Sequence, residues 1–227
     1  MIAIMALGTA LVSRPDPLPA EQSSQPRAAP VRKLSYKDVR RGLFALSKIQ
    51  NAAIVMLGDS LTEGGPWREL TGCPSIVNRG VSGDTTKGVR DRLDDVLNMH
   101  PRAVLMMIGV NDITLRVPKE TTIRNYQAIL DRLEDSGART FVNYVLPVAA
   151  SYGRRRMNEE ISALNIAIVG LVAGRPHVTP IDLGPLVRGS NGYLGEEFSY
   201  DGLHLSPKGY EVWRDAIAPS IAEFCAL

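Results

Sequence analysis

Five short apolar runs alternate with longer amphipathic segments from Ser35 onward, and this alternation constrains the fold more than any other feature of the sequence. The runs show little apolar–polar alternation, which is typical of parallel strands buried on both faces. The pattern predicts β–α units and an α/β fold in which helices cover both faces of a parallel sheet. The predicted strands are Ala53–Leu57, Ser75–Asn78, Ala103–Ile108, Thr140–Leu146 and Val178–Ile181.

The segments between these strands carry apolar residues three or four positions apart, as helices with one buried stripe do. The last segment has Ser206 at the N-cap position and Pro207 at the first helical position, which is a typical helix start. Trp67 and Trp213 are expected in the core. The predicted helices are Ser35–Ile49, Lys87–Met99, Thr122–Ser136, Arg155–Ala173 and Pro207–Phe224.

The composition favours one soluble domain with a small neutral or apolar substrate. The 227 residues are 44% hydrophobic and 22% charged, which is ordinary for a globular domain with a buried core. A net charge of +2 gives no basic surface of the kind that nucleic-acid binding requires. Cys73 and Cys225 have no C-x-x-C spacing, and the three histidines are scattered along the chain. The sequence therefore predicts neither a disulfide framework nor a metal site.

The N-terminal residues 1–30 differ in composition from residues 31–227, which are predicted to form a single domain. Ile2 to Val12 form an apolar run as long as the hydrophobic region of a signal peptide, although no Lys or Arg precedes it. The run is too short to span a bilayer as a helix, and no transmembrane segment follows it. Residues 13–30 are rich in Pro, Ala, Ser and Gln, which is typical of a linker. We expect an exported protein, periplasmic or secreted, with a cytoplasmic protein as the alternative.

Glycines and polar residues follow three successive predicted strands, as Gly58 to Ser60, Asn78 to Thr86 and Gly109 to Asp112. Ligands of open parallel sheets bind outside the carboxyl ends of the strands, so we expect the chemistry there. The phosphate-binding pattern G-x-x-x-x-G-K-[ST] is absent, because Thr86 precedes Lys87 where the pattern needs glycine. The patterns G-x-G-x-x-G and G-x-S-x-G are absent as well.

A serine nucleophile needs a base within hydrogen-bond reach and a third group that orients the base. His204 lies in the loop after the last predicted strand, at the sheet edge where Ser60 emerges, whereas His100 and His177 are expected at the opposite edge. Asp201 precedes His204 by three positions and can hold the imidazole ring in one turn. From the residues alone, an aspartate that caps a turn beside an incidental histidine is the alternative.

Acyl transfer also needs hydrogen-bond donors aimed at the developing oxyanion. Gly83 can offer a backbone N–H with no side chain in the way, and Asn111 can offer a side-chain amide. These donors and the serine follow three different predicted strands. Their concurrence makes Ser60, rather than any other serine, the candidate nucleophile.

Four sequence blocks, in order, resemble the SGNH hydrolases, also called GDSL lipases and esterases. The blocks are GDSLTEGG, NRGVSGDTT, GVND and DGLHLSPKGY, and the resemblance extends from about Ile54 to Trp213. It implies a flavodoxin-like three-layer α/β/α sandwich with a five-stranded parallel sheet. It also implies carboxylic ester hydrolysis through an acyl-enzyme, without a cofactor. The residues that it implies are Ser60, Asp201 and His204 as the triad, with the N–H groups of Ser60 and Gly83 and the Asn111 side chain as the oxyanion hole.

The block residues next to the serine have further expected roles. From the sequence alone, Asp59 could be a second acid beside Ser60, but the resemblance implies a structural residue that stabilises the turn. Asp112 is expected to anchor the third block in the same way. Thr62 and Glu63 are expected to cap the helix that follows Ser60.

The substrate is predicted only as a class. Short acyl or acetyl esters are expected, because no long apolar stripe remains outside the predicted core. An acyltransferase or a polysaccharide O-deacetylase that acts on a glycan-linked ester is the alternative with the same residues, and a non-catalytic binding module is a third. The sequence does not indicate an oligomeric state. The loops expected to form the acyl pocket are Gly64–Gly72, Arg116–Glu120, Pro147–Arg156 and Leu186–Tyr200.

Overall fold

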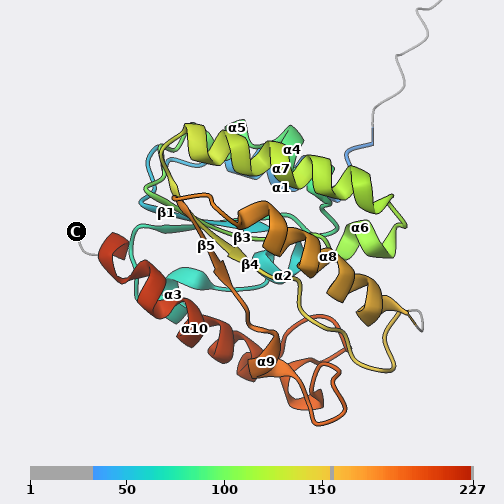
Figure 1. Cartoon of the computed structure of the whole chain (residues 1–227). Helices are drawn as coiled ribbons and strands as arrows, with labels where there is room; N and C mark the ends of the chain where they lie inside the picture. Colours follow the sequence, from blue (N-terminus) through green and yellow to red (C-terminus); the bar gives the residue numbers. More distant parts are fainter. Residues whose placement is uncertain (1–32, 154–155, 226–227) are drawn as a thin grey trace, which may run out of the picture. The chain divides into compact units, whose positions relative to one another are not determined.

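A five-stranded, fully parallel sheet with the strand order β2-β1-β3-β4-β5 forms the centre of the fold (Figure 1). The computed structural model describes residues 33–153 and 156–225, so the predicted signal segment and linker at residues 1–30 lie outside the described residues. This strand order is that of flavodoxin-like proteins. The strands are β1 (Ile54–Gly58), β2 (Ile76–Gly80), β3 (Ala103–Met107), β4 (Arg139–Asn143) and β5 (Val178–Ile181).

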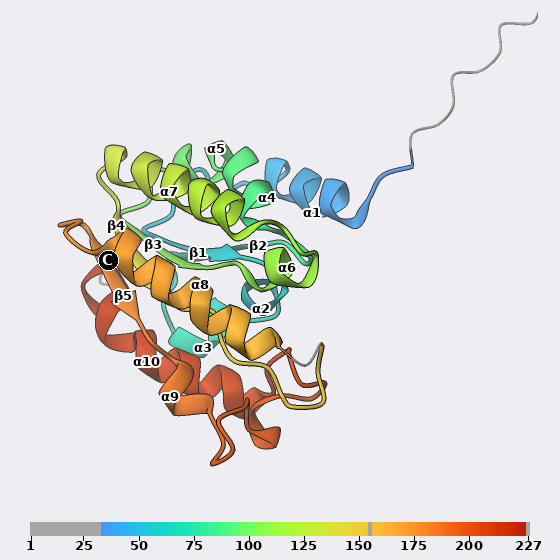
Figure 2. The ribbon, with the colours of Figure 1, turned by 45° about the vertical axis from the view of Figure 1, so that its right-hand side comes forward.

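Helices cover both faces of the sheet, which confirms the predicted three-layer sandwich (Figures 1 and 2). Two short helices, α2 (Ser60–Glu63) and α6 (Val110–Thr114), follow β1 and β3 at the carboxyl edge. The first layer contains α1 (Tyr36–Ala45), α4 (Thr86–Asp91), α5 (Asp94–Leu97), α7 (Lys119–Asp135) and α8 (Met157–Val172). The second contains α3 (Trp67–Thr71), α9 (Gly184–Val187) and α10 (Pro207–Cys225), and a short 3-10 helix at Glu196–Phe198 precedes α10.

The central strands β1 and β3 are buried along their whole length, because each lies between two other strands and under helices on both faces. Successive side chains of β1 enter different cores. Val55 and Leu57 pack with the α4, α5, α7 and α8 layer, whereas Ile54 and Met56 pack with the α3, α9 and α10 layer. A strand with two apolar faces shows no apolar–polar alternation, which is why the sequence pattern identified it.

The predicted helix Ser35–Ile49 ends at Ala45. Two further predicted elements end earlier or break. Strand β4 ends at Asn143 and not at Leu146, because the Asn165 side chain takes both the N–H and the carbonyl of Val145. The predicted helix 87–99 is two short helices, α4 and α5. Between them Arg92 leaves the helical conformation, and its buried guanidinium donates hydrogen bonds to Asp84 and the Gly58 carbonyl.

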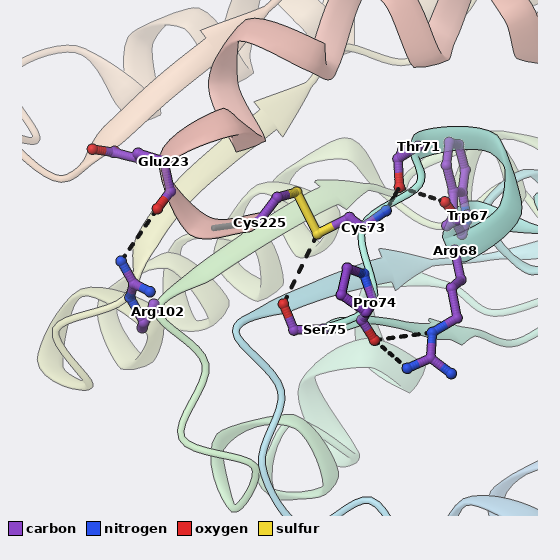
Figure 3. Close-up of a disulfide and its surroundings, with 9 residues drawn as sticks. All are labelled: Trp67, Arg68, Thr71, Cys73, Pro74, Ser75, Arg102, Glu223 and Cys225. Carbon is purple, nitrogen blue, oxygen red and sulfur yellow. Dashed lines mark hydrogen bonds between the residues drawn. A yellow bond between two sulfur atoms is a disulfide. The ribbon is translucent and has the colours of Figure 1, made fainter. Parts of the chain in front are cut away.

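The two cysteines form a disulfide, so the prediction of no disulfide framework is wrong (Figure 3). Cys73 follows α3 and Cys225 ends α10, with the Cα atoms 5.2 Å apart and 152 positions between them in the chain. The two helices belong to the same layer, where the rings of Trp67 and Trp213 meet edge to face with centroids 4.7 Å apart. Both tryptophans are buried, as predicted. Spacing in the sequence gave no sign of this bond because it depends on tertiary packing.

Candidate active site

The turn between β1 and α2 places Ser60 at the carboxyl edge of the sheet. Asp59 accepts a hydrogen bond from the Leu61 N–H at 3.1 Å and so caps α2, the helix that begins at Ser60. Gly58 allows close packing here, since a Cβ at this position would lie 2.3 Å from the Met107 carbonyl oxygen. The chain therefore leaves the sheet after Gly58, and Ser60 lies at the sheet edge as the first residue of α2.

Asp59 has the turn-stabilising role that was expected of it, and the prediction that Thr62 and Glu63 cap α2 is wrong. Both residues lie inside the four-residue helix, whose N-cap is Asp59, and the side-chain acceptor for its first turn is the Asp59 carboxylate. Burial raises the pKa of Asp59 to about 7, against the hydrogen bond from Leu61, which lowers it. Burial therefore favours the neutral form of this carboxyl group, which argues against a second acid that is permanently charged beside Ser60.

Ser60, His204 and Asp201 form a continuous chain of hydrogen bonds. The Ser60 Oγ lies 3.0 Å from the His204 Nε2, and the His204 Nδ1 lies 2.6 Å from the Asp201 Oδ2. A carboxylate can only accept, so Nδ1 carries the hydrogen and Nε2 of the neutral ring accepts from the serine hydroxyl. This arrangement has the order and the tautomer that a nucleophile, a base and an orienting acid require.

Asp201 is fixed by backbone donors as well as by the histidine. Its Oδ1 accepts the N–H groups of Leu203 at 2.9 Å and His204 at 2.7 Å. Burial alone would raise the pKa of Asp201, but the hydrogen bonds from His204 and from the two amides hold it below its ordinary value. The group is therefore ionised at neutral pH. The Ser199 hydroxyl donates to the His204 carbonyl at 2.7 Å and completes the turn.

Gly83 and Asn111 lie at the carboxyl ends of the two strands that flank β1. Gly83 has a φ of +74°, a conformation that favours glycine, in the turn after β2. Within residues 33–153 and 156–225, no acceptor takes the N–H of Gly83 or that of Ser60. The Asn111 Nδ2 donates one hydrogen to the Asp84 carbonyl at 2.8 Å and keeps a second one.

Asp112 fixes the strand end that carries Asn111. Its buried carboxylate accepts the Thr86 N–H at 2.8 Å and the Thr86 hydroxyl at 2.5 Å, which joins the turn after β3 to the start of α4. Asp112 is thus the anchor that was expected. His100 lies shortly before β3 and His177 lies directly before β5. Both are therefore at the amino edge of the sheet, opposite the edge that carries Ser60, as expected.

An apolar pocket of about 470 Å³ opens beside Ser60 and His204. Two of the loops expected to form it do so, Gly64–Gly72 and, through Tyr200, Leu186–Tyr200. The other two expected loops do not: the described residues of Arg116–Glu120 and Pro147–Arg156 do not line this pocket. The start of α10 also lines the pocket, through Pro207 and Tyr210. This was not expected, because the sequence predicted the segment only as a helix with one buried face. A second pocket of about 460 Å³, beside α6 and α8, contains neither Ser60 nor His204. The remaining lining residues of the first pocket are Gly64, Pro66, Leu70, Tyr200, Leu205, Pro207 and Tyr210.

Among residues 33–153 and 156–225, no three His, Cys, Asp or Glu side chains gather closely enough to hold a metal ion. No helix in the same part of the chain is both long and apolar enough to cross a membrane.

The GDSL-like Lipase/Acylhydrolase family model matches residues 56–212, a segment that contains Ser60, Gly83, Asn111, Asp201 and His204. The chain belongs to this family. It is therefore a member of the SGNH hydrolase superfamily and a carboxylic ester hydrolase of the GDSL type.

Several relatives agree with this assignment. Platelet-activating factor acetylhydrolase IB subunit alpha1 of Rattus norvegicus is 28% identical over 182 residues, which is 77% of each chain. An arylesterase of Vibrio mimicus is 30% identical over 129 residues, 49% of this chain and 64% of the arylesterase. The crystal structure of a GDSL-like lipase of Bacteroides thetaiotaomicron has the same fold, with a TM-score of 0.70 at 23% identity, and the match covers 83% of this chain and 99% of the lipase.

Proposed function

We propose that this GDSL hydrolase cleaves esters through a covalent acyl-enzyme on Ser60, with His204 as base and Asp201 as the group that orients it. The observation that carries the proposal is the hydrogen-bond chain from Ser60 through His204 to Asp201, open to an apolar pocket. In the first step, His204 Nε2 takes the hydroxyl proton while Oγ attacks the ester carbonyl carbon. The imidazolium that results is stabilised by the ionised Asp201.

The oxyanion of the tetrahedral intermediate then needs donors. The N–H groups of Ser60 and Gly83, which have no acceptor in the described part of the chain, and the second Nδ2 hydrogen of Asn111 are the available ones. When the intermediate collapses, His204 returns its proton to the leaving alcohol. Water enters, loses a proton to His204 and attacks the acyl-enzyme, and the second collapse releases the acid and restores the Ser60 hydroxyl.

The pocket supports an uncharged ester with an apolar group of short to medium length. Among the described residues, the titratable side chains that line the pocket are His204 and two tyrosines, and none is an acid, a lysine or an arginine. This lining favours an uncharged substrate. A volume of about 470 Å³ exceeds what an acetyl group needs, and the acetylhydrolase and arylesterase names of the two relatives place acetyl and aryl esters among the first substrates to test.

The test compares the wild-type protein with the Ser60→Ala variant on p-nitrophenyl acetate, butyrate and octanoate. Wild type should hydrolyse these esters and be labelled at Ser60 by an alkyl phosphonate probe, located by peptide mass spectrometry, whereas the variant should do neither. If wild type hydrolyses no ester and the probe leaves Ser60 unlabelled, the proposal is wrong. Adding acetylated glycans and free glycan acceptors shows whether transfer outcompetes hydrolysis, which is the outcome that would favour an acyltransferase.

We also propose that the protein is exported. The disulfide between Cys73 and Cys225 supports this, because disulfides persist in oxidising compartments and are rare in the cytosol. The apolar run at Ile2 to Val12 supports it as well. Fractionation of expressing cells tests the proposal: recovery of oxidised protein outside the cytoplasm is expected, and recovery of reduced protein in the cytoplasm alone would contradict it.

A further inference from the structure

Helix α1 contacts the loop that carries Gly83 through charged side chains. The Lys37 Nζ donates a hydrogen bond to the Gly83 carbonyl at 2.6 Å and lies 3.5 Å from the Asp84 carboxylate. Arg40, one turn later, donates to the Gly80 carbonyl at 3.2 Å. Helix α1 lies outside residues 56–212, the part of the chain that matches the family model. In each of these contacts, the partner on α1 therefore comes from outside the matched region.

Glu63 reaches the same loop from the helix of the candidate nucleophile. Its Oε2 accepts the Ser82 N–H at 2.5 Å and the Ser82 hydroxyl at 2.8 Å. Its Oε1 accepts the Tyr36 hydroxyl and lies 3.5 Å from the Arg40 Nε. Burial alone would raise the pKa of Glu63, but the hydrogen bonds from Tyr36 and Ser82 lower it below its ordinary value, so the side chain stays an acceptor at neutral pH.

These contacts fix the Gly83 N–H from both sides. That N–H belongs to the peptide unit between Ser82 and Gly83, so Glu63 holds the residue before it and Lys37 holds the carbonyl after it. A glycine with a φ of +74° has no side chain to restrain its backbone, and its conformational freedom is the largest of any residue. The direction of this one donor therefore depends on external contacts.

We propose that Glu63 and Lys37 are positioning residues that aim the Gly83 N–H at the oxyanion, which couples α1 to the chemistry at Ser60. The inference rests on the proposed function. Ser60 is the first residue of α2 and Glu63 is the last. The contact between Glu63 and Ser82 therefore fixes the position of the Gly83 loop relative to the nucleophile. A donor that serves only the transition state changes kcat and leaves the binding of the ground state unchanged.

The experiment uses the full-length chain with the variants Glu63→Ala and Lys37→Met. Each should lower kcat by about 10-fold, less than deletion of a donor, with KM within about 2-fold, since a displaced donor weakens only the transition-state contact. The affinity for phenylboronic acid, which forms a tetrahedral adduct on the serine, should fall in parallel with kcat. Product inhibition by the free acid should not change. Lys37→Arg, which keeps a donor, should recover most of kcat.

Arg41→Met is the matched control. Arg41 lies on the same helix and pairs with Asp95 at 3.4 Å, but it has no hydrogen bond to residues 80–84 within the described part of the chain. It should keep the wild-type kcat. The Lys37 side chain is 43% exposed, whereas that of Glu63 is 14% exposed. The Lys37 variants therefore remain informative if Glu63→Ala unfolds, and melting curves identify that case.

Three results would overturn the proposal: a kcat unchanged in the Lys37→Met variant, a change confined to KM, or an equal loss in Arg41→Met. Its failure is separate from failure of the proposed function. Wild-type ester hydrolysis and phosphonate labelling of Ser60 decide the proposed function, and the variants are compared only against an active wild type.

Discussion

The His204 Nε2 lies 3.0 Å from the Ser60 Oγ although 144 positions separate the two residues in the chain. The contact exists because Ser60 follows the central strand β1 and His204 follows β5, and both strand ends point to the same edge of a parallel sheet. The loop that carries His204 folds back over this edge before α10 begins. Chemistry at Ser60 thus depends on the whole sheet being assembled.

Replacing Asp201 by Asn should lower kcat by about 10²- to 10⁴-fold, because an amide no longer fixes the imidazole in the tautomer that accepts the serine proton. Steady-state kinetics with p-nitrophenyl butyrate measure the loss. Asp215→Asn, an exposed carboxylate of α10 paired with Arg214, is the control and should keep full activity. A loss below 3-fold for Asp201→Asn would show that the carboxylate does not orient His204.

Replacing Asn111 by Ala should lower kcat by about 10²- to 10³-fold and leave KM nearly unchanged, as expected for a donor used only in the transition state. Asn111 also bonds to the Asp84 carbonyl, so the melting temperature must be measured alongside. A rise in KM at constant kcat would instead assign Asn111 to ground-state binding.

Acyl-chain preference should follow the pocket beside Ser60. Each buried methylene contributes up to about 0.8 kcal/mol, or about 4-fold in kcat/KM, so the wild type should prefer butyrate and octanoate esters over acetate. Leu70→Trp narrows the pocket and should reverse this preference. Ile166→Trp, on the exposed side of α8, is the control. Equal chain-length profiles for wild type and Leu70→Trp would place the acyl group elsewhere.

Removing the disulfide by the double substitution Cys73→Ser and Cys225→Ser should lower the free energy of unfolding by about 2–5 kcal/mol, because the bond closes a long loop in the unfolded chain. Urea unfolding with and without a reductant measures the effect. The reductant should destabilise wild type and leave the double variant unchanged. A wild type that does not respond to the reductant would mean that the bond does not form.

The contribution of Asp59 to the free energy of unfolding should fall as the pH rises from about 4 to about 7. The pKa of Asp59 is raised by burial from 3.8 in an exposed aspartate to about 7, so in this window the folded form keeps a proton that the unfolded chain has lost. Above pH 7 both forms have lost it and the effect levels off. Asp59→Asn keeps an acceptor for the Leu61 N–H and should flatten this slope, as urea unfolding at several pH values would show. Identical slopes in the two proteins would assign the proton to another group.

The five strands and the positions of the strand-end loops could be predicted from the sequence, because a strand buried on both faces is an unbroken apolar run. Ser60, Gly83 and Asn111 were predicted as site residues for the same reason: each lies in the segment that follows such a run. Finer features depend on contacts that no local pattern records. The break at Arg92 follows from its burial against Asp84, and the end of β4 follows from the Asn165 side chain.

Tertiary contacts also explain what was missed at the site. Glu63 looked like a helix cap, but its partner Ser82 is 19 positions away in the chain. The α10 side of the pocket and the disulfide both arise where α3 and α10 share one layer, which the sequence indicates only as two separate amphipathic segments. A lysine on α1 gave no signal, since exposed lysines are common on any helix.

The disulfide closes a covalent ring that runs from Cys73 to Cys225 and contains Gly83, Asn111, Asp201 and His204 but leaves Ser60 outside. A protease that cuts once inside this ring cannot release a fragment. The nicked protein should keep its full mass on a non-reducing gel and separate into two pieces only after reduction. Cleavage between Ser60 and Cys73 would instead break the covalent connection between the candidate nucleophile and Gly83, Asn111, Asp201 and His204.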